Sequence, residues 1–183
     1  MTLFELKREI VKLLSSLEDP YLEARVLLNS LGFSSLDQIT KKELDVPEDK
    51  VGLALKKAQE RRDGRPMAYI TNEKEFYGLS FYVDENVLIP RPDTEIIVEK
   101  AITLYKEKNY KGNILDLCTG SGAIATAISY TLNKDVLFSD ISPSALDIAI
   151  RNYENLTKKK ANARLGDLFE PWDDAKFSLI ATN

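Results

Sequence analysis

The sequence predicts an α/β fold with an open parallel sheet, preceded by a smaller all-helical region. Two observations carry this prediction. Between Asn113 and Asp140 the chain has the pattern of a strand, a glycine turn, a helix and a second strand, which is the first half of a nucleotide-binding βαβ unit. Before residue 65, in contrast, apolar residues recur at helical spacing.

The helical region comes first in the chain. An amphipathic helix is predicted over residues 2–17, where leucine and isoleucine recur every three or four positions. A second helix is predicted over about 20–31, a short helical turn from residue 35, and a third helix over 47–63, each with a proline, serine or glycine at an end. The apolar faces of these helices are most simply their own core. The alternative is a face that binds a partner.

A β-hairpin is predicted next, over residues 66–88. Aromatic and β-branched residues concentrate at 67–71, 76–77 and 79–83, and Gly78 separates the last two runs. The hairpin would connect the helical region to the parallel sheet.

A proline-rich segment follows the hairpin. Pro90 and Pro92 stiffen it, and acidic residues at positions 93 and 95 suit the first turn of a helix that continues to Tyr105. Arg91 and Thr94 in this segment have two interpretations, either helix-start chemistry or contact with a ligand.

The remaining strands and helices alternate, as a parallel sheet requires. Strands are predicted at 114–117, 136–139, 163–165 and 177–182, and helices at 123–132 and 142–153. Three of the strands are followed by polar side chains, those of Asp140, Asp167 and Asn183. Ligands of open α/β sheets bind outside the carboxyl ends of the strands, so we expect these side chains and the glycine turn to converge.

The glycine turn itself has the sequence Cys118-Thr119-Gly120-Ser121-Gly122. Glycines let a ligand approach the backbone, and the helix that begins there points free N–H groups at the same place. Asp140 lies eighteen residues after Gly122, where an acid can bind two ribose hydroxyls. Gly120, Gly122 and Ala125 also fit a dinucleotide fingerprint, so a nicotinamide cofactor, S-adenosylmethionine and a turn without a ligand all stay open at this point.

Composition narrows the classes of function. The chain has 183 residues, 44% hydrophobic and 30% charged, and its net charge of -4 argues against a nucleic-acid backbone as the main partner. The single cysteine, Cys118, excludes an internal disulfide and fits a reducing cytoplasm. Because there is no histidine, a Ser-His-Asp triad, a Cys-His dyad and a zinc site are excluded.

Targeting signals are also not expected. Charges recur every few residues at the N-terminus, unlike a signal peptide. No apolar run approaches the length of about eighteen residues that a membrane span needs. We therefore expect a cytoplasmic protein.

Several motifs together give the chain a family resemblance. They are FYGLSFYVDENVLIPRPDTE (76–95), ILDLCTGSGAIA (114–125), SDISPSAL (139–146), GDLFEPW (166–172) and FSLIATN (177–183). With these motifs the chain resembles the HemK/PrmC family of protein-glutamine methyltransferases over essentially its whole length. The proline-arginine-proline segment joined to the hairpin is specific to that family, whereas the glycine loop alone is not.

The resemblance implies a domain organisation and an activity. It implies a helical substrate-docking domain at 1–65, a β-hairpin linker at 66–88 and a class I, Rossmann-like S-adenosylmethionine-dependent methyltransferase domain at 89–183. The family transfers a methyl group from S-adenosylmethionine to the glutamine amide nitrogen of the Gly-Gly-Gln motif in peptide chain release factors. The implied partner is a release factor. We expect a monomer that does not bind nucleic acid directly.

The resemblance also implies roles for individual residues. Five consecutive residues would wrap the methionine end and ribose of S-adenosylmethionine: Cys118, Thr119, Gly120, Ser121 and Gly122. Asp140 would hold the ribose hydroxyls, while Asp167 and Leu168 would flank the adenine. Asn183 matches the first residue of the family's Asn-Pro-Pro-Tyr motif, which makes it the catalytic residue, in contact with both donor and substrate.

The chain departs from the family at its end. It stops at Asn183, so the rest of the Asn-Pro-Pro-Tyr motif and the last three strands of a seven-stranded sheet are expected to be missing. The strand at 177–182 would then be an exposed edge. On this basis we expect an inactive or weakly active fragment.

Three other functions remain as alternatives at this stage. One is an amino-methyltransferase acting on nucleic-acid bases, which shares the Asn-Pro-Pro-Tyr chemistry. Another is a nicotinamide-dependent oxidoreductase, although the chain shows no catalytic Tyr-Lys pair. The last is a non-catalytic fragment whose helical domain still binds a partner.

Overall fold

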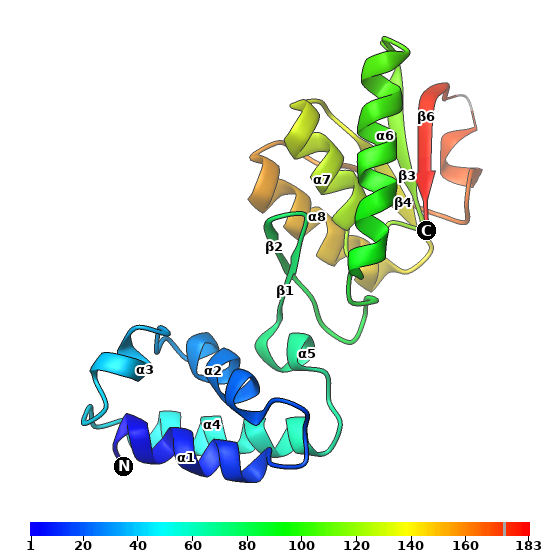
Figure 1. Cartoon of the computed structure of the whole chain (residues 1–183). Coiled ribbons are helices and arrows are strands. Elements are labelled where there is room, and N and C mark those ends of the chain that lie inside the picture. Colours follow the sequence, from blue (N-terminus) through cyan, green and yellow to red (C-terminus); the bar gives the residue numbers. More distant parts are fainter. Residues whose placement is uncertain (174) are drawn as a thin grey trace. The chain divides into compact units, whose positions relative to one another are not determined.

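The chain forms two compact units, Met1–Thr71 and Asn72–Asn183 (Figure 1). This is seen in a computed structural model, which describes residues 1–173 and 175–183. No helix within the described ranges combines the length and the apolarity needed to cross a membrane.

The first unit is helical. Its helices are α1 (Leu3–Leu13), α2 (Pro20–Ser30), α3 (Asp37–Thr40), α4 (Glu48–Arg62) and α5 (Met67–Thr71). A capping box starts α1, in which the Glu5 N–H donates to Thr2 and the Thr2 N–H donates to Glu5. Helix α1 ends earlier than the predicted residue 17, because the Ser15 and Leu17 N–H groups bond three residues back rather than four.

The core of this unit lies between α1, α2 and α4. Its members are apolar and buried, and they include Leu3, Leu6 and Ile10 of α1, Leu27 and Leu28 of α2, and Ala54 and Ala58 of α4. The predicted apolar periodicity therefore corresponds to a packed core on one face of each helix.

The segment 67–71 was predicted as a strand, and that prediction was wrong. It forms the short helix α5, because the Tyr69 and Ile70 N–H groups both donate to the Pro66 carbonyl, at 3.0 and 3.2 Å. The Thr71 hydroxyl adds a bond to the Met67 carbonyl at 3.0 Å. Local hydrogen bonds thus outweigh the β propensity of the aromatic and β-branched residues.

The hairpin is consequently shorter than the predicted 66–88. It consists of β1 (Glu73–Phe76) and β2 (Leu79–Tyr82), paired antiparallel. Its two turn residues, Tyr77 and Gly78, both have positive φ (53° and 70°), the backbone typical of a tight hairpin turn.

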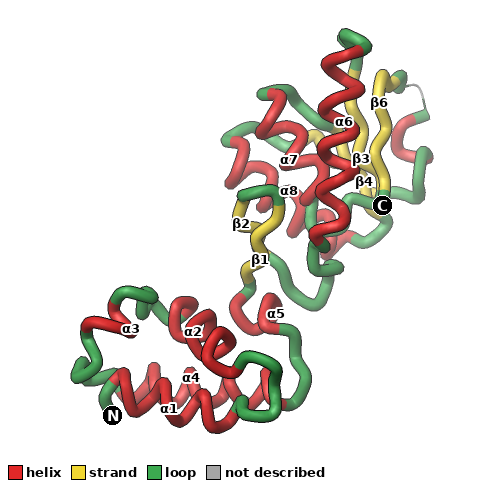
Figure 2. Tube along the Cα trace, in the orientation of Figure 1, coloured by secondary structure: helices red, strands yellow, loops and turns green. Residues whose placement is uncertain are grey.

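The second unit contains the parallel sheet. After the hairpin come the 3₁₀ turn η1 (Pro92–Thr94), α6 (Glu95–Glu107), β3 (Asn113–Leu117), α7 (Ala123–Leu132), β4 (Leu137–Asp140), α8 (Pro143–Thr157), β5 (Asn162–Leu165), η2 (Glu170–Trp172) and β6 (Phe177–Thr182). The strand order is β5-β4-β3-β6, and every pair is parallel. Figure 2 shows the strands in yellow, with β3, β4 and β6 of this sheet labelled. The predicted α/β fold with a parallel sheet is confirmed.

The register of the sheet brings the strand ends together. Leu117, the last residue of β3, pairs with Ser139 of β4 on one side and Thr182 of β6 on the other. Because the chain leaves β3 toward β4 and returns later to add β6 on the opposite side, β3 lies at a topological switch point. Among the described strands, β6 pairs with β3 alone.

Candidate functional site

The candidate site begins with the glycine loop that follows β3. Cys118, Gly120 and Gly122 all have left-handed backbone, with φ of 55°, 54° and 77°. This conformation is unfavourable by about 1–2 kcal/mol for a residue with a side chain, such as Cys118. The Thr119 N–H donates to the Ser139 carbonyl at 3.0 Å and so ties the strained loop to β4.

The two loop glycines are needed for different reasons. A Cβ on Gly120 would meet nothing within 4 Å, so this glycine leaves open space beside the loop. A Cβ on Gly122 would lie 3.0 Å from the Cα of Ala149, so this glycine lets α8 pack closely against the loop. The sequence-based explanation, ligand approach, therefore suits Gly120 but not Gly122.

Asp140 ends β4 and braces the loop. Its Oδ2 accepts from the Gly120 N–H at 2.8 Å, and its Oδ1 accepts from the Ser142 N–H at 3.0 Å. Each carboxylate oxygen has a second lone pair, which leaves acceptors for the hydroxyls of a ligand. Asp140 thus fixes the loop as well as offering the predicted acceptors.

Asp167 and Leu168 follow β5 and lie beside the end of β4. The preceding residue, Gly166, donates its N–H to the Asp140 carbonyl at 3.1 Å. Leu168 has left-handed backbone (φ 44°) and is 53% exposed. Ile141, which sequence reasoning missed, is 67% exposed directly after Asp140, so two bare apolar side chains flank the strand ends. The sequence feature that could have identified Ile141 is its position between the acid that ends a strand, Asp140, and the helix cap Ser142.

Asp116 is a second residue that sequence reasoning missed. It lies in β3, is 1% exposed, and its Oδ2 accepts from the Thr119 hydroxyl at 2.6 Å and the Ala125 N–H at 3.1 Å. Its Oδ1 has no hydrogen-bond partner within the described ranges. Burial raises the pKa of this carboxyl to about 7. An acid inside the apolar run 114–117 was the available signal.

The carboxylates act together on Cys118. Burial raises the pKa of its thiol, and the negative charges of Asp140, Asp116 and Asp167 raise it further. The thiol is therefore protonated at neutral pH. Asp140 and Asp167 thus bring carboxylates near this loop residue, which favours a cationic ligand.

Asn183, at the end of β6, reaches the proline-rich segment. Its Nδ2 donates to the Thr94 hydroxyl oxygen at 2.9 Å. Both residues line a pocket of about 100 Å³, whose other lining residues are Leu88, Ile89, Pro90, Arg91, Cys118, Thr119, Gly120, Ser121, Ala123 and Ile124. An adjoining pocket of about 430 Å³ shares Leu88, Arg91, Thr94 and Asn183.

This pocket contains part of the predicted site. Cys118, Thr119, Gly120, Ser121 and Asn183 line it, as do Arg91 and Thr94 of the proline-rich segment. Gly122, Asp140, Asp167 and Leu168 are not among its lining residues. The structure thus separates a small pocket beside Asn183 from the row of polar groups along the strand ends.

Asn152 of α8 forms a hydrogen bond to the glycine loop. Its Oδ1 accepts from the Tyr82 N–H at 2.9 Å, and its Nδ2 donates to the carbonyls of Tyr82 and Ser121, both at 2.9 Å. It is buried, and sequence reasoning did not identify it because no local pattern marks it. Asn152 joins the hairpin to the glycine loop.

The chain is similar in sequence to a known family and to several known proteins. Residues 94–183 match the family described as Methyltransferase small domain. The release factor glutamine methyltransferase of Leptospira interrogans is 43% identical over 129 residues, covering 68% of this chain and 45% of that protein. Those of Rhodopirellula baltica (40% identity; 91% of this chain, 58% of that protein) and Escherichia coli (33%; 96% and 64%) are also similar. The chain spans about half the length of the curated relatives it matches.

Proposed function

We infer that this chain belongs to the family of release factor glutamine methyltransferases, that it binds S-adenosylmethionine, and that it transfers the methyl group of this donor. The acceptor we propose is the side-chain amide nitrogen of the glutamine in the Gly-Gly-Gln motif of peptide chain release factors. The observation that supports the proposal is the pocket that Asn183 shares with the glycine loop, because Asn183 is the residue proposed to bind the acceptor and the loop is the segment proposed to bind the donor.

The residues present fit the methyl donor. S-adenosylmethionine supplies an electrophilic methyl group on a positively charged sulfur, and the carboxylates around Cys118 favour such a cation. The open space at Gly120 allows close approach to the backbone, and Asp140 has lone pairs for the ribose hydroxyls. In this proposal Cys118 to Gly122 wrap the methionine end and ribose, and Asp167 and Leu168 flank the adenine.

The acceptor presents a different requirement. An amide nitrogen is a poor nucleophile, because its lone pair is delocalised into the carbonyl group. Hydrogen-bond acceptors can hold the NH₂ group so that the nitrogen faces the methyl group, which lowers the barrier through orientation and electrostatic support. No histidine is needed for this chemistry.

Asn183 can provide such an acceptor, and Thr94 determines which end of its amide is available. Because the Asn183 Nδ2 donates to the Thr94 hydroxyl oxygen, the Asn183 Oδ1 is left to accept from the NH₂ group of the substrate. Thr94 is therefore a positioning residue in this proposal, in line with the ligand-related interpretation of the proline-rich segment.

The test offers S-adenosylmethionine with a labelled methyl group to the protein together with release factor, DNA or ribosomal RNA. We expect label on the release factor, at the low level of a weakly active chain, and its loss when the Gly-Gly-Gln glutamine is changed to alanine or when Asn183→Ala is used. Calorimetry of S-adenosylmethionine binding is run in parallel, so that a loss of donor binding is distinguished from a loss of transfer. Label on nucleic acid but not on release factor would contradict the proposal.

A further inference from the structure

Helix α1 has a second organised face besides the one in the core. Phe4, Lys7, Arg8 and Val11 recur at spacings of three and four residues and line a hollow of about 650 Å³. Another face of α1 carries the core residues Leu3, Leu6 and Ile10. We call this hollow the α1 groove. All its lining residues belong to the first unit, and its far wall comes from α2 and the region around α3.

The α1 groove exposes apolar surface. Phe4 is 44% exposed, Tyr21 68% and Ile39 65%, and all three line it. Large apolar side chains that gather in a hollow mark a binding surface more strongly than the same residues scattered singly. Part of the groove is therefore apolar and accessible.

Cations surround that apolar surface. Lys7, Arg8, Lys12 and Lys42 line the α1 groove, and no aspartate or glutamate does. None of the four forms an ion pair with any residue in 1–173 or 175–183. Arg8 and Lys42 each lie 5.9 Å from the centre of the Phe4 ring. This positive charge is local, because the chain as a whole has a net charge of -4.

An adjoining hollow differs from the α1 groove in its acidic lining residue. It has a volume of about 410 Å³, shares Lys7, Tyr21 and Ile39 with the α1 groove, and contains both Asp19 and Arg25. Of these two hollows, the α1 groove is the one whose lining cations have no acidic lining residue beside them.

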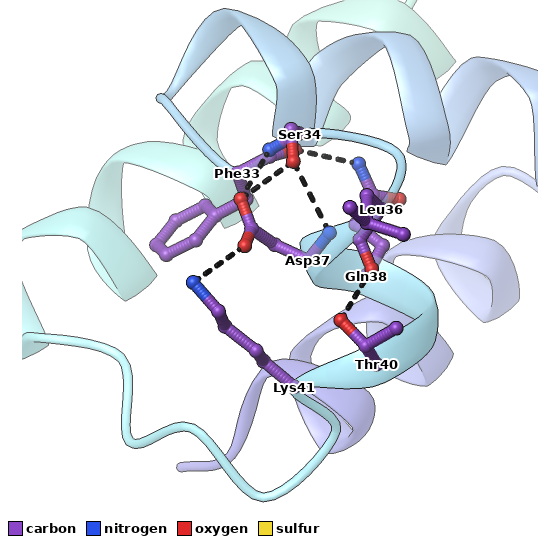
Figure 3. Close-up of polar contacts among 7 residues, drawn as sticks. All are labelled: Phe33, Ser34, Leu36, Asp37, Gln38, Thr40 and Lys41. Atoms are coloured by element: carbon purple, nitrogen blue, oxygen red, sulfur yellow. Dashed lines mark hydrogen bonds and ion pairs between the residues drawn. The ribbon is translucent and has the colours of Figure 1, made fainter.

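The wall that carries Ile39 is held in place by side-chain bonds. Helix α3 has only four residues, yet Asp37 accepts from the Ser34 hydroxyl at 2.6 Å and pairs with Lys41 at 2.8 Å, as Figure 3 shows. Gln38, which also lines the groove, donates to the Phe33 carbonyl at 2.9 Å. A wall fixed in advance loses little conformational entropy when a partner binds.

We propose that the α1 groove binds an amphipathic helix of a partner protein, with the apolar face of that helix on Phe4, Tyr21 and Ile39 and an acidic face toward the cations. The groove wall from Phe4 to Lys12 is about 12 Å long at 1.5 Å per residue, which accommodates about two helical turns. Helix-in-groove binding of this kind uses apolar anchors and a charged rim.

A nucleic-acid strand suits the groove less well. Single strands bind through a series of aromatic side chains on which successive bases stack. Here the lining includes two aromatic residues, Phe4 and Tyr21, together with aliphatic Val11 and Ile39, and two cations already lie near the Phe4 ring.

The groove proposal rests on the proposed function only for the identity of the protein that carries the helix.

The test uses the full 183-residue chain and a fluorescent synthetic helix with leucines on one face and glutamates on the other. We expect saturable binding by fluorescence anisotropy, about tenfold weaker for Arg8→Glu/Lys12→Glu. Ile39→Ser is expected to weaken binding about fivefold. The matched controls, Lys56→Glu/Lys100→Glu and Leu53→Ser, change exposed residues outside the groove and should bind like the unaltered chain.

Several outcomes would overturn the proposal. They are no binding of the peptide, equal binding of a scrambled peptide whose leucines do not share a face, and equal losses in the groove variants and their controls. Binding of a single-stranded RNA that the groove variants abolish, without peptide binding, would also overturn it. Because the peptide assay needs neither methyl donor nor release factor, its result is independent of the methyl-transfer test.

Discussion

The helical unit and the α/β unit differ in where they hold backbone strain and charge. Within residues 1–71, all of which the structure describes, the left-handed positions are glycines, Gly32 and Gly64. In the second unit, left-handed backbone also occurs at residues with side chains, among them Cys118 and Leu168 beside the strand ends. The first unit carries unpaired cations on its surface, and the second gathers carboxylates at one edge of its sheet.

In our proposals, the first unit serves recognition of a partner and the second serves the chemistry. An exposed groove of cations and apolar groups needs only a stable helical frame, so its residues can change with little effect on folding. A loop that is strained and buried against carboxylates depends on its neighbours for both folding and binding. The following changes test that separation, from the largest expected effect to the smallest.

The largest effect is expected at Asp116. Its pKa is about 7 in the folded protein and near 3.8 in an unfolded chain, so the folded state keeps a proton that the unfolded state loses. The free energy of unfolding should therefore fall as the pH rises through this window, by roughly 3 kcal/mol between about pH 5 and pH 8. Asp116→Asn should remove most of this slope.

Urea unfolding followed by tryptophan fluorescence reports on the second unit, which contains Asp116, because the single tryptophan of the sequence, Trp172, lies in that unit. Equal pH dependence in the unaltered chain and in Asp116→Asn would show that the buried carboxyl does not govern stability.

The next effect is expected at Asp140. Asp140→Ala removes acceptors for the ribose hydroxyls and frees the Gly120 N–H, so S-adenosylmethionine affinity should fall roughly 100-fold, by calorimetry. Asp147→Ala, which removes an exposed acid from α8, is the matched control and should bind normally. Unchanged affinity in Asp140→Ala would remove this residue from the site.

The loop glycines should separate stability from binding. Gly122→Ala adds a Cβ against Ala149 and a left-handed side chain, which we expect to cost about 2 kcal/mol of unfolding free energy. Gly120→Ala adds only the backbone term, about 1 kcal/mol, but places a methyl group in the open space beside the loop. It should weaken donor binding more than it weakens the fold. A larger loss of unfolding free energy in Gly120→Ala than in Gly122→Ala would contradict the packing argument.

The smallest effect is expected in the α1 groove. Arg8→Glu/Lys12→Glu should change the free energy of unfolding by less than about 0.5 kcal/mol, since both side chains are exposed and unpaired. Circular dichroism during urea unfolding measures it. Leu6→Ala, in the core of the same helix, should cost about 3 kcal/mol and shows that the measurement detects this unit. A large loss in the groove variant would mean that its charges stabilise the fold.

Sequence patterns located much of the second unit, because periodicity is a local property. Helix α7 at 123–132 and strand β6 at 177–182 have the predicted bounds. The segment 67–71 was mispredicted because its helix depends on hydrogen bonds to the Pro66 carbonyl, which composition does not reveal. No local pattern marks Asn152, because its partners Tyr82 and Ser121 are far from it in the chain.

The candidate site divides in the same way. The glycine turn and the polar strand ends could be predicted, since parallel strands bring their carboxyl ends to one edge. The bracing of the loop by Asp140 and the orientation of Asn183 by Thr94 could not, because each is a contact between distant segments. The ligand roles of Cys118 to Gly122, Asp140, Asp167, Leu168 and Asn183 stay predictions.

The Asn152 side chain has a consequence for how motion spreads through the second unit. Its amide clamps the backbone of Tyr82 on one side and that of Ser121 on the other. An opening of the glycine loop that displaces this amide would also remove the acceptor of the Tyr82 N–H. We therefore expect the hydrogen-exchange rate of this hairpin amide to report such an opening, at a position that no ligand needs to touch.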